Sequence, residues 1–307
     1  MKIIFFGNTE FSNPTLEKCN ASLDVVSVVT NPSKKMGRGR RFSDTPVKIL
    51  ADKLKINVIQ VENLENKDFV QKLRDLKPDL FVVVAYKILP KLLLSIPTMG
   101  AINLHSSLLP KYRGAAPIQR SILNHDKITG ISTFLIEPKV DTGKILMQKE
   151  CKISDNDNYG SLSSKLSNIG AQLIVESIEK YSSGDFSPII QDEKLVTLAP
   201  KIKKEEYIID WKKDLTTIDA QIKAFSPHPG AYTMINGKRL KIFEAKMIKG
   251  INYKEVGKII NLSKTCFEVT CLSGSLKVYE VQIEGKKRMS SKDFMIGMSN
   301  LENVILG

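Results

Sequence analysis

The segment at 80–85 constrains the fold of this chain more than any other feature. It reads LFVVVA, an unbroken apolar run of the kind found in parallel strands buried on both faces of a sheet. Other apolar or β-branched runs also read as strands, at 2–7, 23–30, 101–104 and 130–136. Helix-like segments separate them, at 46–55, 66–77 and 160–181. This alternation predicts an α/β domain with an open, Rossmann-like sheet.

Open sheets of this type often bind a nucleotide, but the turn after the first strand argues against one. Thr9 and Ser12 stand where the second and third glycines of a G-x-G-x-x-G motif would follow Gly7, and the chain has no P-loop. A ligand at the strand ends is therefore not expected to be NAD or ATP.

The sequence pattern changes after about residue 184. The stretch 189–206 is mixed and polar, as in a linker. Five short strand-like runs follow between 231 and 283, separated by turn dipeptides such as Asn236-Gly237 and Ser273-Gly274. We therefore predict an α/β domain at 1–188, a linker at 189–206 and a small OB-like β-barrel domain at 207–307.

The chain is basic, and its excess charge is concentrated in two places. Its 307 residues carry 46 Lys and Arg against 33 Asp and Glu, a formal charge of +13. The segment 31–41 (NPSKKMGRGRR) holds five cations and no anion, and the segment 221–290 holds 13 cations against 5 anions. A local excess of this kind favours a polyanionic partner, although charge runs are also often simply solvated surface.

Other common classes of protein are disfavoured. The four cysteines are scattered without a C-x-x-C pair or a nearby His, so we expect reduced thiols and no zinc site. The longest apolar run is far too short to span a membrane, and the apolar stretch at the start is too short for a signal peptide. We expect a cytoplasmic protein without a membrane segment.

Asn103, His105 and Asp141 are the strongest candidates for chemistry. Asn103 and His105 are two apart at the end of a predicted strand, so they share a face at the edge where α/β sheets bind ligands. Asp141 lies in the loop after the strand at 130–136. An amide can stabilise an oxyanion, an imidazole exchanges protons near neutral pH, and a carboxylate can orient it. A single His at a strand end is more often structural, and the spacing leaves both interpretations open.

Motifs in a fixed order run through the chain. They are IIFFGNTEFS, GRG, SDTPVK, VVVAY with ILPK, INLHSSLLPKYRGAAPIQRSI, VDTG, QDEKLVTLAPKIKKEE and AFSPHPGAY. In content and in order they resemble the folate-dependent formyltransferases. The resemblance covers essentially the whole chain, and RGAAPIQRSI is most similar to the members that formylate methionyl-tRNA.

The resemblance implies transfer of a formyl group from 10-formyltetrahydrofolate to the α-amine of methionyl initiator tRNA, which yields N-formylmethionyl-tRNA for translation initiation. The family's catalytic residues fall on Asn103, His105 and Asp141. In that scheme the amine attacks the formyl carbon, and Asn103 with protonated His105 stabilises the oxyanion. Asp141 holds His105 and helps a proton reach the leaving folate nitrogen. No metal is required.

The resemblance also implies binding residues. Those for the folate are Ser107, Leu108, Leu109, Pro110, Ala85, Tyr86 and Ile88. Those for the tRNA are Lys34, Lys35, Arg38, Arg40 and Arg41 in the basic loop and Lys238, Arg239, Lys286, Lys287 and Arg288 in the second domain. For any one of the second-domain cations, a solvated strand edge is an equally good explanation.

Two other functions fit the same motifs. A formyltransferase that acts on a small amine, such as an amino sugar or glycinamide ribonucleotide, would share the three candidate catalytic residues but would not need the basic loop. A non-catalytic RNA-binding protein on an enzyme scaffold would not need those three residues. We expect formyl transfer to methionyl initiator tRNA, carried out by a monomer.

Overall fold

The structure is a computed structural model that describes residues 1–36, 41–184, 187–250, 252–298 and 300–307. The chain forms two compact units. The first unit contains Met1–Pro117, Ile128–Lys152 and Ser163–Pro200, and the second contains Ile118–Lys127, Ile153–Leu162 and Lys201–Gly307. None of the described helices is both long and apolar enough to cross a membrane.

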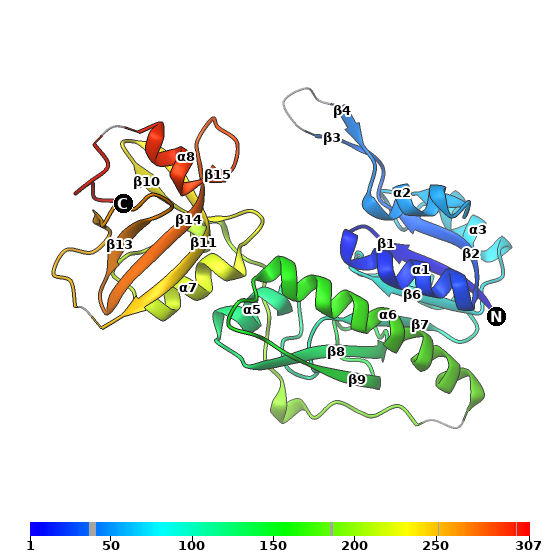
Figure 1. The fold of residues 1–307 in the computed structure, drawn as a ribbon. Coiled ribbons are helices and arrows are strands. Elements are labelled where there is room, and N and C mark those ends of the chain that lie inside the picture. The colour runs from blue at the N-terminus through cyan, green and yellow to red at the C-terminus, as the bar shows by residue number, and fades with distance from the viewer. Residues whose placement is uncertain (37–40, 185–186, 251, 299) are drawn as a thin grey trace. The chain divides into compact units, whose positions relative to one another are not determined.

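The first unit is built on a seven-stranded mixed sheet (Figure 1). Its strands are β1 (Lys2–Gly7), β2 (Asp24–Thr30), β5 (Val58–Gln60), β6 (Leu80–Val84), β7 (Ala101–His105), β8 (Ile128–Leu135) and β9 (Ile145–Lys152), in the order β5-β2-β1-β6-β7-β8-β9. The strands from β5 to β7 are parallel, whereas β8 is antiparallel to β7 and to β9. The predicted Rossmann-like α/β domain is therefore confirmed, with an antiparallel pair of strands at one edge.

Helices cover both faces of this sheet. They are α1 (Asn13–Ser22), α2 (Pro46–Lys53), α3 (Lys67–Asp75), α4 (Lys91–Leu94) and α6 (Tyr159–Ser183), whereas α5 (Pro117–Leu123) belongs mostly to the second unit (Figure 1). Thr45 and Asn66 start α2 and α3 as N-caps, since their side chains accept hydrogen bonds from the amides of Lys48 and Phe69. Helix α6 packs on β8, where the Ser177 hydroxyl lies 2.6 Å from that of Thr133.

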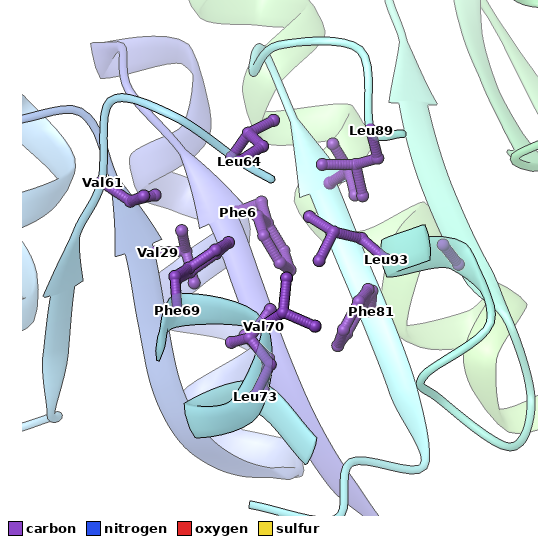
Figure 2. Packing of buried hydrophobic residues seen from close by; sticks show 13 residues of the cluster. Phe6, Val29, Val61, Leu64, Phe69, Val70, Leu73, Phe81, Leu89 and Leu93 are labelled. Carbon is purple, nitrogen blue, oxygen red and sulfur yellow. The ribbon is translucent and has the colours of Figure 1, made fainter. Parts of the chain in front are cut away.

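The core on the α3 side joins strands β1 and β6 to α3 and α4 (Figure 2). Phe6 and Phe81 have ring centroids 4.9 Å apart, and both side chains are fully buried. Leu73 of α3 and Leu93 of α4 pack against this pair in the same cluster. Ala101 of β7 belongs to the cluster as well, so the face of β7 that carries Ala101 continues directly from the core.

A short antiparallel hairpin projects from the region of the basic loop. It pairs β3 (Lys34–Met36) with β4 (Arg41–Ser43). The sequence did not predict these strands. Arg38 and Arg40, which the resemblance places in tRNA binding, lie outside the described residues.

The second unit is an antiparallel sheet accompanied by helices, which include most of α5. It contains α7 (Leu215–Ala224), β10 (Ala231–Ile235), β11 (Lys238–Lys249), β12 (Ile259–Ile260), β13 (Phe267–Cys271), β14 (Gly274–Ile283), β15 (Met289–Ser290) and α8 (Ser291–Ile296). The order is β10-β11-β14-β13-β12, and β15 also pairs with β14. Among the described residues no ladder joins β10 to β12, and a register shift in β11 near Glu244 bends the sheet. The unit is therefore a curled antiparallel sheet of the half-barrel type.

Candidate active site

Two adjacent parallel strands bring the candidate residues to one edge of the sheet. Val84, the last residue of β6, pairs with Leu104 of β7, so the loops after these strands start side by side. Asn103 and His105 share their face of β7 with Ala101, because side chains alternate along a strand. The site thus begins where the apolar core ends.

His105 is buried and is held by a hydrogen bond at one of its two ring nitrogens. Its side chain is only 8% exposed. Its Nε2 lies 2.9 Å from the backbone oxygen of Tyr112, and a carbonyl can only accept, so Nε2 carries a hydrogen. Its Nδ1 lies 3.7 Å from Oδ2 of Asp141. The Tyr112 carbonyl therefore leaves Nδ1 as the nitrogen that can take or release a proton on the Asp141 side.

Asp141 is fixed in an unusual backbone conformation. Its φ angle is 53°, in the left-handed region, which Asp adopts more readily than most residues. Its Oδ2 accepts a hydrogen bond of 2.8 Å from the Gly114 amide, and its side chain is 10% exposed. The carboxylate therefore faces His105 at 3.7 Å without reaching normal hydrogen-bond distance.

Asn103 is half-buried and keeps its amide free. Within the described part of the chain, the Asn103 side chain takes part in no hydrogen bond. It lies opposite Phe134 of β8, whose ring meets that of His105 edge-on with centroids 6.4 Å apart. The structure thus brings an amide donor, an imidazole and a carboxylate to one end of β7, next to the ring of Phe134. Such a set can stabilise a developing oxyanion and move a proton.

The loops expected to bind folate flank this site. Ala85 follows β6 with φ of 48° and is exposed, and Ile88 is 70% exposed. Tyr86 packs on Phe6 with ring centroids 5.5 Å apart, and burial raises the pKa of its hydroxyl to about 12. The turn is therefore anchored by the half-buried Tyr86, while Ile88 exposes an apolar side chain.

The second loop expected to bind folate, at 107–110, is held by two polar side chains. The hydroxyl of Ser132 accepts from the amide of Leu109 at 2.9 Å and donates to the carbonyl of Ser107 at 2.7 Å. The amide of Gln148 donates to the carbonyl of Leu109 at 2.9 Å. Leu109 is buried, whereas Leu108 and Pro110 are half-buried. The loop therefore presents apolar side chains on a fixed backbone.

The candidate cations of the second unit come together at one end of its sheet. Lys238 and Arg239 start β11, and Lys286, Lys287 and Arg288 follow β14, its partner strand. The Glu284 amide donates to the Arg239 carbonyl at 2.8 Å, which joins the two groups. All five cations are exposed.

The five cations are not equally available. Arg288 is paired with Glu280, with an Nε to Oε1 distance of 2.6 Å, and its guanidinium lies 4.3 Å from the ring centroid of Phe243. Arg239 lies over Tyr232 at 4.5 Å. Among the described residues, Lys238, Lys286 and Lys287 form no ion pair.

The first unit carries the other candidate tRNA-binding cations. Lys34 is exposed in β3, Lys35 lies in the same strand and Arg41 begins β4.

Sequence reasoning missed Arg113 and Gln191, which meet beside Asp141. Arg113 is 6% exposed and Gln191 is 6% exposed. The Arg113 Nη2 donates to Oε1 of Gln191 at 2.8 Å, and Nε2 of Gln191 donates to the Asp141 carbonyl at 2.9 Å. Both residues lie inside quoted motifs, but their meeting joins segments 78 positions apart, which spacing along the chain cannot reveal.

Comparison with known families gives matches to both parts of the chain. A family model described as "Formyl transferase" matches residues 1–178, and one described as "Formyl transferase, C-terminal domain" matches residues 201–299. Among solved structures, HypX from Aquifex aeolicus in complex with tetrahydrofolic acid has a TM-score of 0.69 at 16% identity. That match covers 99% of this chain and 48% of the HypX chain, and it supports the fold alone.

Curated relatives match over nearly the full length. Methionyl-tRNA formyltransferase of Dictyoglomus turgidum is 45% identical over 302 residues, which is 97% of this chain and 96% of that protein. Methionyl-tRNA formyltransferase of Caldanaerobacter subterraneus is 40% identical over 309 residues, covering 100% of both chains. The candidate site lies within the first matched region, and the chain belongs to the formyl transferase family, alongside the methionyl-tRNA formyltransferases.

Proposed function

We propose that this protein transfers the formyl group of 10-formyltetrahydrofolate to the α-amine of methionyl initiator tRNA. The observation that carries the proposal is the joint presence of a complete acid–base site in the first unit and a cluster of free cations in the second. Asn103, His105 and Asp141 supply the chemistry, and the relatives with this name align over the whole chain.

The geometry suggests a role for each catalytic group. The neutral amine attacks the formyl carbon, and negative charge develops on the formyl oxygen. The free amide of Asn103 donates to that oxygen. Nδ1 of His105 and the Asp141 carboxylate, 3.7 Å apart, receive the proton from the amine and pass it to the leaving folate nitrogen. The hydrogen bond from Nε2 to Tyr112 keeps Nδ1 facing the reaction.

The flanking loops suit a flat, partly apolar donor. The exposed side chain of Ile88 and the half-buried side chains of Leu108 and Pro110 offer apolar surface, while the exposed turn at Ala85 offers backbone groups to a ring with hydrogen-bonding edges. Three neighbouring residues fix the position of this surface. Tyr86 packs on Phe6, the Ser107 hydroxyl donates to the Lys111 carbonyl, and Leu109 lies in a buried apolar cluster.

The basic groups suit the phosphates of an RNA. Lys238, Lys286 and Lys287 stand free at one end of the curled sheet, where Lys side chains can contact phosphates without reading sequence. We expect an OB-like nucleic-acid-binding role for this unit. The basic loop with Lys34, Lys35, Arg38, Arg40 and Arg41 is the second expected tRNA contact. We expect a monomeric cytoplasmic enzyme.

A formyltransferase that acts on a small amine is the main alternative, because it would use the same three catalytic residues. The cations of the second unit favour the tRNA, since a small acceptor does not need a second charged surface.

The decisive experiment supplies 10-formyltetrahydrofolate with methionyl initiator tRNA, and in parallel with an amino-sugar nucleotide and glycinamide ribonucleotide. We expect formylmethionine after ester hydrolysis of the tRNA product. Turnover of a small amine without formylmethionine would show that the acceptor is wrong. A variant with Lys286 and Lys287 changed to Ala should use the tRNA less efficiently but bind the formyl donor as tightly as the wild-type protein does.

A further inference from the structure

A buried polar cluster beside the proposed active site has no part in the chemistry described so far. Arg113 and Gln191 are both 6% exposed, although Arg and Gln are seldom buried unless their polar atoms are paired. All members of the cluster belong to the first unit. The contacts of these two side chains lead directly to Asp141.

Gln191 bonds to the backbone of the turn that carries Asp141. Its Nε2 donates to the carbonyl of Asp141 at 2.9 Å and to the carbonyl of Gly143 at 2.7 Å. The two bonds span the turn from its first residue to its third. They therefore hold Asp141 in the left-handed conformation, with φ of 53°, that aims its carboxylate at His105.

Arg113 fixes the orientation of the Gln191 amide. Its Nε and Nη2 donate to Oε1 of Gln191 at 3.0 and 2.8 Å. A guanidinium only donates, so Oε1 must face Arg113 and Nε2 must face the two carbonyls. The other side of the guanidinium binds Glu193, whose Oε1 is 2.8 Å from Nη2. That contact holds the pKa of the Glu193 carboxyl below its usual range.

The backbone around Arg113 reaches the other half of the site. The Tyr112 carbonyl accepts from Nε2 of His105, and the Gly114 amide donates to Oδ2 of Asp141. The same stretch pairs with Thr197, whose carbonyl accepts from the Arg113 amide at 2.9 Å. One segment thus contacts both His105 and Asp141, and its side chain anchors Gln191.

We propose that Gln191, oriented by Arg113, is a positioning residue that sets the separation between Asp141 and His105 during formyl transfer. This inference rests on the proposed function, because that function gives Asp141 its part in proton transfer. Gln191 itself makes no contact with substrate. Gln191 acts only through the backbone of the Asp141 turn. Loss of its amide hydrogens should therefore slow the chemical step and leave the binding of both substrates intact.

The variant Gln191→Glu tests this directly. It keeps an acceptor for Arg113 and the shape of the side chain, but it places an oxygen against the carbonyls of Asp141 and Gly143. A misplacement of about 1 Å at a reacting group can cost on the order of 100-fold in rate, so we expect kcat to fall by roughly 10- to 100-fold. KM for the folate and for the tRNA should stay within about twofold, because a change confined to the transition state lowers kcat alone.

Two further variants distinguish loss of positioning from misfolding or a general effect of changing the cluster. Gln191→Met also lacks the donors, without adding charge, and should show the same loss of kcat if Gln191→Glu fails to fold. Glu193→Gln is the matched control, because it alters the exposed end of the cluster and leaves the bonds from Gln191 to the turn in place. It should keep nearly the full kcat.

A double-mutant cycle with Asp141→Asn separates positioning from general damage. If Gln191 acts through Asp141, Gln191→Glu should add little to the loss caused by Asp141→Asn. Losses that multiply, or an unchanged kcat in both folded Gln191 variants, would overturn the inference. Full activity of Asp141→Asn alone would instead refute the role proposed for Asp141 and, with it, the inference, whereas no formylmethionine from the wild-type protein would refute the proposed function. A slow Asp141→Asn with a fast Gln191→Glu would refute the inference alone.

Discussion

Gly143→Ala should damage the site through a steric conflict of known size. A Cβ at Gly143 would lie 1.6 Å from the carbonyl oxygen of Leu135 and 3.3 Å from Cδ2 of Phe134. Leu135 ends β8 and cannot yield easily, because its own amide is bonded to the Lys144 carbonyl at 2.9 Å. The turn must move by about 1.4 Å to bring the first contact to 3.0 Å.

The displaced turn carries Asp141, so the rate should suffer more than the fold. We expect kcat to fall by about 100-fold and the free energy of unfolding to fall by about 1–3 kcal/mol, as for other overpacked sites. Single-turnover formylation and thermal unfolding measure the two effects. Gly297→Ala is the control, since its nearest neighbours would lie at 3.6 and 3.7 Å and its φ of −83° suits Ala. A Gly143→Ala enzyme with the wild-type rate and melting temperature would refute the reasoning.

Three further predictions concern the core, the charged surface and pH. Phe81→Ala should lower the free energy of unfolding by about 3–5 kcal/mol, measured in urea, because its ring is fully buried beside Phe6. Changing Lys286 and Lys287 to Ala should reduce the slope of log K against log salt for tRNA binding by about 2, in a fluorescence titration. The hydrogen bond from Arg120 lowers the pKa of Glu206 from its ordinary 4.5. The folded state is therefore stabilised above pH 4.5, and this stabilisation is lost as the pH falls through the lowered pKa. In Glu206→Gln the melting temperature should consequently fall less steeply as the solution is made acidic.

Much of the fold was predictable because the buried strands have a strong local signal. The all-apolar run at 80–85 contains β6, at the centre of the sheet. Strand β9 was missed because its residues after Leu146 are mostly exposed and polar, as suits an edge strand. The antiparallel edge of the sheet also escaped prediction, since strand direction depends on pairing and not on local sequence.

The candidate site was predictable only in part. The period of a strand predicted that Asn103 and His105 share one face, and the structure places Nδ1 of His105 at 3.7 Å from Asp141. The partners that orient them were invisible, because Tyr112 acts through its carbonyl and Gly114 through its amide. Any residue has those backbone groups, so no residue type marks them. Gln191 lies in a stretch that reads as polar linker, yet the folded chain buries it.

We propose that His105 serves the chemical step and not the binding of tRNA. The most direct test compares His105→Ala with the wild-type protein, by the single-turnover rate of formyl transfer and by the Kd for methionyl initiator tRNA. We predict a rate loss of about 100- to 10,000-fold, the range typical of a general acid–base residue, with an unchanged Kd. A variant that transfers formyl at the wild-type rate, or whose loss is explained by weaker tRNA binding, would contradict the account.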